Sequence, residues 1–233
     1  MKVGILNTDA LKPEFVAEFG EYPDMFAELF LAVNPSVTLQ TYSVMDSHYP
    51  EHFDEVDGYV ITGSKASVYD DVPWIHELID FVQVLHAEKK KLVGICFGHQ
   101  LVAHALGGKT LPATVGWNVG VQRNELTAAA SSYQITEDVF HIPLNHQDQV
   151  AEVAPGASIL ASTASCPIAA TGLGEHILTF QGHPEFQKGY ARALLDMRRE
   201  ILGEPTYQAA IESLNAETDN LRVARWILDF IAA

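Results

Sequence analysis

The segment LVGICFGHQ, residues 92–100, predicts the central element of the fold. An apolar run ends at Ile95, and a Gly-x-Cys-x-Gly pattern centred on Cys96 leads into a helical pattern. This order predicts a sharp turn between a buried strand and a helix, with glycines on both sides because larger side chains would clash there. The turn places Cys96 at a helix N-terminus, where free N–H groups stabilise a thiolate. Cys96 is therefore the candidate nucleophile.

Around this turn the first half of the chain alternates strands and helices. Strand patterns cover Lys2–Leu6, Val37–Val44, Gly58–Thr62 and Lys91–Ile95, and helical patterns cover Tyr22–Val33, Val72–Leu85 (with Asp71 as its N-cap) and His99–Leu106. This order predicts an α/β fold in which helices flank a mostly parallel central sheet.

After about residue 110 the pattern changes to short strands separated by turns. They cover Thr114–Thr127, Val150–Ala154, Ile159–Ser162, Ile168–Thr171 and His176–Gln181. We expect a small antiparallel excursion that returns to the main sheet. A helical C-terminal tail, residues 190–233, completes a single domain over residues 1–233, because no linker-like segment divides the chain.

Composition excludes several classes of function. The 233 residues include 30 acidic and 14 basic ones, a net charge of −16, and so acidic a surface repels nucleic acid. No apolar run reaches the roughly 18 residues of a membrane span. With only two cysteines a disulfide framework is not expected, and Cys166 is interpreted as a small buried side chain. These features predict a cytoplasmic protein.

A second motif, QGHPE at residues 181–185, offers a proton carrier for Cys96. Pro184 disfavours the helical conformation at His183, and in an extended segment residues two apart point the same way. The Glu185 carboxylate can then orient the His183 imidazole. Taken alone, His-x-Glu also fits an ordinary surface ion pair. Metal binding by Cys96 and His99 is the other alternative, but no second ligand pair with zinc spacing occurs, so no metal is expected.

Together, GICFGHQ (94–100) and QGHPE (181–185) resemble the two signatures of class I glutamine amidotransferases, over roughly residues 1–190. The chain is similar to the glutaminase domain of GMP synthase and to free-standing γ-glutamyl peptidases. The resemblance implies a flavodoxin-like fold. It also implies a catalytic triad in which Cys96 is the nucleophile, His183 the acid and base, and Glu185 the residue that orients His183.

The same resemblance implies an oxyanion hole formed by the backbone N–H groups of Gly63, Ser64 and Phe97. Many relatives have a second glycine where this chain has Ser64. A backbone donor survives that change, although the loop becomes less free to move.

For substrate binding, the resemblance implies Gln100 and the segment 145–148. Within that segment we expect main-chain contacts near Gln147 and Asp148, and a contact between the Asp148 carboxylate and the substrate ammonium. A solvated loop acid is the alternative interpretation of Asp148. We interpret His146 as a structural residue that forms hydrogen bonds within the turn.

The sequence leaves three functions open. The first is cysteine-dependent hydrolysis of glutamine or a small γ-glutamyl compound through a γ-glutamyl thioester, with no cofactor. The second is a glutaminase subunit that delivers ammonia to a separate synthase chain, and the third is a non-catalytic regulatory binding protein. Many relatives have an aromatic residue before the catalytic histidine, whereas γ-glutamyl peptidases can have a glycine there, as at Gly182. This residue favours hydrolysis without an obligate partner.

Overall fold

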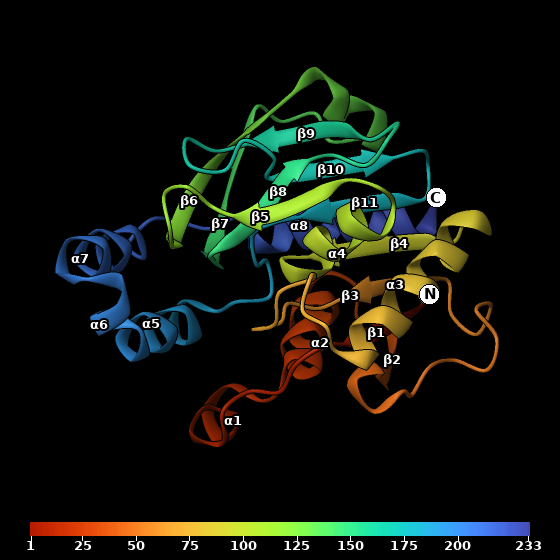
Figure 1. Cartoon of the computed structure of the whole chain (residues 1–233), viewed down its shortest axis with the longest axis horizontal. Helices are drawn as coiled ribbons and strands as arrows, with labels where there is room; N and C mark the ends of the chain where they lie inside the picture. Colours follow the sequence, from red (N-terminus) through yellow and green to blue (C-terminus); the bar gives the residue numbers. More distant parts are fainter.

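The computed structural model describes residues 1–233, and its centre is a nine-stranded sheet in the order β2-β1-β3-β4-β11-β10-β9-β6-β7 (Figure 1). Five neighbouring strands are parallel: β2 (Thr38–Ser43), β1 (Lys2–Asn7), β3 (Gly58–Ile61), β4 (Lys91–Ile95) and β11 (Ile177–Phe180). Four more continue the sheet antiparallel: β10 (Ala170–Leu173), β9 (Ser158–Ser162), β6 (Asn118–Leu126) and β7 (Val139–His146). A separate pair joins β5 (Lys109–Pro112) to β8 (Asp148–Glu152).

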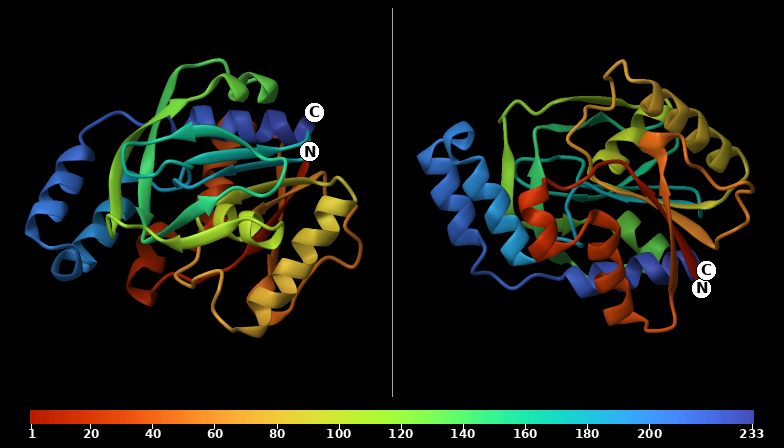
Figure 2. Two further views of the ribbon diagram at one scale, coloured as in Figure 1. Left: turned by 45° about the horizontal axis from the view of Figure 1, so that its top comes forward. Right: turned by 90° about the horizontal axis from the view of Figure 1, so that it is seen from below.

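Helices cover both faces of the parallel part of the sheet (Figure 2). One face carries α2 (Tyr22–Val33) and α8 (Asn220–Ala232), and the other carries α3 (Pro73–Ala87) and α4 (Phe97–Ala105). The strands are apolar on both sides for this reason: in β1, Val3 packs on the side of α2 and Leu6 on the side of α3. A parallel strand buried on both faces lacks the alternating pattern of a half-exposed strand.

The remaining helices lie at one end of the molecule (Figure 1). They are α1 (Pro13–Phe19), α5 (Lys188–Met197), α6 (Arg199–Leu202) and α7 (Glu204–Ser213), and short 3-10 turns cover Val44–Asp46 and Ala128–Tyr133. Helix α5 packs against α7 and the outer strands, while α1 meets α5 through aromatic side chains. No helix in the chain combines the length and the apolar character needed to cross a bilayer.

The predicted α/β fold is confirmed, and its antiparallel part is larger than expected because four strands of the same sheet belong to it. Strand β7 was not anticipated from the sequence. It contains Pro143, which cannot donate a backbone hydrogen bond and argues against a central strand. The structure resolves the conflict, since β7 lies at the edge of the sheet. The N-cap of α3 is Val72 rather than Asp71, whose carboxylate accepts a hydrogen bond from His76.

The helical tail covers the sheet. Trp226, Ile227 and Phe230 of α8 are buried in the main core, and Trp226 meets Phe140 of β7 edge to face, with 5.5 Å between ring centroids. These three side chains are therefore part of the core and are not available on the surface to bind a partner protein.

Candidate active site

The candidate site residues follow neighbouring parallel strands. Ile95, the last residue of β4, lies opposite Phe180, the last residue of β11. Cys96 and the QGHPE motif therefore leave the sheet at the same edge, where the clefts of open α/β sheets form. A cavity of about 480 Å³ lies there, lined by Cys96 and His183 among others.

Cys96 occupies a strained turn. Its backbone φ of 53° and ψ of −102° fall outside the regions that residues with a side chain normally adopt. The flanking glycines allow the chain to approach itself closely. A Cβ on Gly94 would lie 2.5 Å from the carbonyl oxygen of Gly98, and a Cβ on Gly98 would lie 2.6 Å from that of Ile61. The Cys96 N–H donates to the Phe180 carbonyl at 2.8 Å, which ties the turn to β11.

His183 and Glu185 form a buried pair. The Nδ1–H of His183 donates to Oε1 of Glu185 at 2.7 Å, and the two side chains are 4% and 0% exposed. The interpretation of this motif as a surface ion pair is therefore wrong. The backbone N–H of His183 donates to the Pro143 carbonyl of β7 at 2.8 Å. The imidazole also stacks on the ring of Phe186.

Gly63 lies between the cysteine and the histidine. A Cβ built on Gly63 would lie 2.8 Å from Cε1 of His183 and 3.7 Å from Cβ of Cys96. Burial alone would lower the pKa of His183, but the negative charges of Glu185 and Cys96 outweigh it and raise the pKa to about 10. At neutral pH this histidine is an imidazolium beside the sulfur.

The predicted oxyanion donors lie in the loop after β3 and at the start of α4. The backbone N–H groups of Gly63, Ser64 and Phe97 donate no hydrogen bond within the protein. The residues after β1 fix the loop: the Thr8 hydroxyl donates to the Gly63 carbonyl at 2.9 Å, and the Asp9 carboxylate accepts from the backbone N–H and Nζ of Lys65. Unpaired donors on a fixed loop are what an oxyanion hole requires.

The three residues predicted to bind substrate differ in burial and in hydrogen-bond partners. Asp148 is half-buried at the start of β8, and its carboxylate accepts hydrogen bonds from Ser67 Oγ at 2.5 Å and the Tyr69 hydroxyl at 3.0 Å. It is not a solvated loop acid. Gln100 is buried, and its Nε2 donates to the Asp148 carbonyl and to Gln181 Oε1. Gln100 thus fixes the wall of the cavity, and Gln147 is exposed at its rim.

Two other buried histidines differ from each other. Nε2–H of His99 donates to the Ile168 carbonyl and Nδ1 accepts from the Thr179 hydroxyl, so both nitrogens are committed and neither is free for a metal. The expected role of His146 in the turn is wrong: neither ring nitrogen has a hydrogen-bond partner, although the ring lines the cavity. Burial lowers the pKa of His146 to about 3, so it is neutral.

Cys166 is a buried side chain, as expected. Its thiol donates to the Ile168 carbonyl, and burial raises the pKa of Cys166 to about 12. The Cys166 thiol is therefore protonated at neutral pH and is a poor nucleophile.

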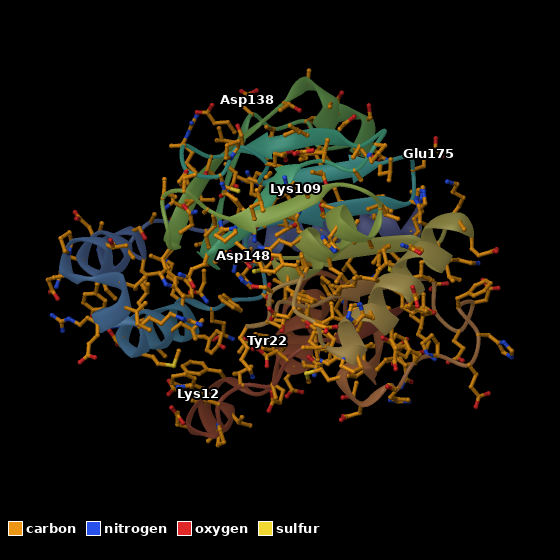
Figure 3. All side chains as sticks on the ribbon, viewed as in Figure 1. Lys12, Tyr22, Lys109, Asp138, Asp148 and Glu175 are labelled. Atoms are coloured by element: carbon orange, nitrogen blue, oxygen red, sulfur yellow. The ribbon has the colours of Figure 1, made fainter.

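The part of the cavity wall formed around α1 and α5 was not predicted from the sequence. This wall consists of Phe15, Phe186, Tyr190, Leu194, Met197 and Arg198, with Trp117 beside them. Figure 3 shows Lys12 and Tyr22, which line the same cavity, below Asp148. Helical spacing along α5 would have placed Tyr190 and Leu194 on one face, but not against a cavity.

Comparisons with known proteins point to one family. The family model described as "Glutamine amidotransferase class-I" matches residues 21–196. A glutamine amidotransferase-like protein of Schizosaccharomyces pombe is 32% identical, with 98% of each chain covered. Gamma-glutamyl peptidase 3 of Arabidopsis thaliana is 33% identical over 78% of this chain and 76% of its own length. The chain belongs to the class I glutamine amidotransferase family.

A solved structure supports the same fold. The glutamine amidotransferase of Methylobacillus flagellatus superposes with a TM-score of 0.79 at 23% sequence identity, covering 99% of this chain and 92% of that one. At this identity the likeness concerns the fold.

Proposed function

We propose that this chain hydrolyses the γ-glutamyl amide bond of glutamine or of small γ-glutamyl compounds, with Cys96 as the nucleophile. The observation that carries the proposal is that Cys96 and the Glu185-bonded His183 face one small space: a Cβ built on Gly63 would lie 2.8 Å from Cε1 of His183 and 3.7 Å from Cβ of Cys96. A cysteine sulfur, an imidazolium and unpaired backbone donors line one cavity.

The chemistry has two halves. The Cys96 thiolate attacks the γ-carbonyl carbon, and the N–H groups of Gly63, Ser64 and Phe97 stabilise the oxyanion. His183 gives its proton to the nitrogen as the C–N bond breaks, which leaves a γ-glutamyl thioester. Water then attacks the thioester, His183 takes its proton, and glutamate leaves with the thiolate restored.

Hydrolysis without a partner is supported by the similarity to a gamma-glutamyl peptidase and by Gly182 before His183. The cavity volume also falls within the range of about 300–1,000 Å³ that holds drug-sized ligands. A site of this size admits a leaving group larger than ammonia.

The test is the purified chain alone, assayed with glutamine and with γ-glutamyl dipeptides for release of glutamate. We expect turnover of at least one substrate and a single adduct on Cys96 after treatment with an electrophilic glutamine analogue. Cys96→Ala should abolish both, while the matched variant Cys166→Ala should retain both. No turnover by the isolated chain, restored by a synthase-containing extract, would instead establish an ammonia-delivering subunit.

A further inference from the structure

Two successive carbonyl groups after β3 face the same side chain. The Thr8 hydroxyl lies 2.9 Å from the Gly63 carbonyl oxygen and 3.2 Å from the Thr62 carbonyl oxygen, within hydrogen-bond distance of both. In an extended strand successive carbonyls alternate between the two sides, so this common direction departs from strand geometry. No backbone N–H donates to either carbonyl, and side-chain hydroxyls alone therefore hold their direction.

The direction of each carbonyl fixes the direction of the N–H that follows it. In a trans peptide unit the C=O and N–H groups point opposite ways, and the chain contains no cis peptide bond. The N–H groups of Gly63 and Ser64 therefore both point away from Thr8. Consecutive N–H groups that point the same way form a concavity that binds anions.

The order of the strands places Cys96 on the side to which these N–H groups point. Strand β3 lies between β1 and β4, and Thr8 follows β1 while Cys96 follows β4. The segment after β3 is thus flanked by Thr8 on one side and by Cys96 on the other. A Cβ built on Gly63 would lie 3.7 Å from Cβ of Cys96, which agrees with this arrangement. Carbonyls held toward Thr8 set the N–H groups toward the nucleophile.

Thr8 is itself held in place. It is fully buried, its backbone N–H donates to Thr62 Oγ1 at 3.0 Å, and the two hydroxyl oxygens are 2.9 Å apart. A hydroxyl carries one proton, and Thr8 uses its proton for the carbonyls, so the Thr62 hydroxyl is the donor within this pair. The Asp9 carboxylate accepts from the backbone N–H of Lys65 at 2.9 Å and thereby fixes the following peptide unit as well.

We propose that Thr8 is a positioning residue for oxyanion stabilisation. Its hydroxyl holds the Thr62 and Gly63 carbonyls away from Cys96 and so directs the N–H groups of Gly63 and Ser64 toward the substrate oxygen on which negative charge develops. Thr8 does not line the cavity and acts only through these two peptide units. The role rests on the proposed hydrolysis for the identity of the anion, but not for the direction of the N–H groups.

The test compares Thr8→Val, which has nearly the same shape but no hydroxyl, with Thr8→Ser, which keeps the hydroxyl. Thr8→Val should lower kcat by about tenfold to a hundredfold, less than the roughly 10²–10³-fold cost of removing an oxyanion donor outright. KM should change by less than about threefold, because the lost interaction is made in the transition state. Thr8→Ser should retain kcat within a few-fold.

Thr171→Val is the matched control. Thr171 is another buried threonine, and its hydroxyl oxygen lies 2.6 Å from that of Thr179, outside the cavity. This variant should lower the unfolding midpoint about as much as Thr8→Val does, because each loses one buried hydroxyl, and it should leave kcat unchanged. If Thr8→Val does not fold, Thr8→Ala should show the same split between kcat and KM.

Labelling of Cys96 separates the role of Thr8 from the proposed hydrolysis. A chloromethyl ketone analogue of glutamine develops an oxyanion when the thiolate adds to its carbonyl, whereas iodoacetamide reacts by direct displacement of iodide. Thr8→Val should slow labelling by the ketone by about tenfold or more and leave labelling by iodoacetamide unchanged.

Equal slowing of both reagents would overturn the role of Thr8, and so would an equal loss of kcat in Thr8→Val and Thr171→Val. Either result would assign the effect to the cysteine or to the fold. Selective slowing of the ketone in a protein that hydrolyses no substrate would instead refute the hydrolysis and leave the role of Thr8 standing.

Discussion

The imidazole of His183 lies face to face on the phenyl ring of Phe186, with 3.8 Å between ring centroids and 10° between ring planes. The aromatic face stabilises the imidazolium and prevents the ring from rotating away from the sulfur. Phe186→Leu should therefore lower kcat by about twofold to thirtyfold, the range that a cation–π contact spans. Phe19→Leu is the control, because Phe19 packs on Tyr190 in the same cluster without reaching His183. An equal loss in both variants would assign the effect to cluster packing.

We expect the Glu185 carboxylate to set the alkaline limit of activity. Because the pKa of His183 is raised to about 10, the imidazolium is present at neutral pH. It loses its proton only as the pH rises through about 10. In Glu185→Gln the main group that raises the pKa is gone and burial remains, so the alkaline limb of the kcat/KM profile should move to lower pH. His183→Ala should cost about 10²–10⁴-fold in kcat, and Glu185→Gln should cost less because the proton carrier survives. An alkaline limb that does not move would refute this role for Glu185.

Gly63→Ala should disable the site while the fold survives. The new methyl carbon would lie 2.8 Å from Cε1 of His183, so the imidazole must move away from its position beside Cys96. We expect kcat to fall by at least about a hundredfold, within the range for loss of a positioned acid–base group, with little change in the unfolding midpoint. Ser64→Gly, one residue further along the loop, keeps the same backbone donors and should retain activity within a few-fold. Comparable activity of the Gly63→Ala variant would contradict this geometry.

Gly182 is required by the close approach of β7. A Cβ at this position would lie 2.5 Å from Cδ1 and 2.7 Å from Cγ1 of Ile142. Gly182→Ala should destabilise the fold by about 1–3 kcal/mol, as overpacking of a core does. Ile142→Ala should recover part of that loss, which a double-mutant cycle in urea unfolding would measure as a coupling energy. Strictly additive effects would show that the two positions do not touch.

The parts of the site that were predictable are those governed by local rules. The turn at Cys96 follows from two glycines and an apolar strand. The pairing of His183 with Glu185 was also predicted, but the extended segment expected to produce it is wrong: Pro184 and Glu185 form a turn, in which the Phe186 N–H donates to the His183 carbonyl. Parallel pairing of β4 and β11 then brings both motifs to one edge of the sheet. The pairing of Glu185 with His183 is local, because the two residues are only two positions apart in the sequence.

The remaining parts depend on tertiary packing that no short pattern encodes. Strand β7 was difficult to predict because Pro143 interrupts its strand-like sequence pattern, and such a segment cannot be distinguished from a loop by sequence alone. Phe186 stacks on His183 because the intervening turn at Pro184 and Glu185 brings the two rings together, and this turn was not predicted from the sequence. Arg198 and Trp117 are 81 positions apart in sequence, and only the docking of α5 beside β6 brings them together.

The hydrogen bond from His183 to Pro143 has a consequence for how the molecule acquires its activity. The candidate nucleophile and its loop come from residues 1–100, whereas the candidate histidine is tied to β7, which pairs with β6 at the far edge of the antiparallel half. Contacts of such long sequence separation form slowly because loop closure must precede them. During refolding, a labelled thiol at Cys96 should therefore regain its protected environment before hydrolysis returns. We therefore expect the site to be completed late in folding, when the antiparallel half of the sheet is in place.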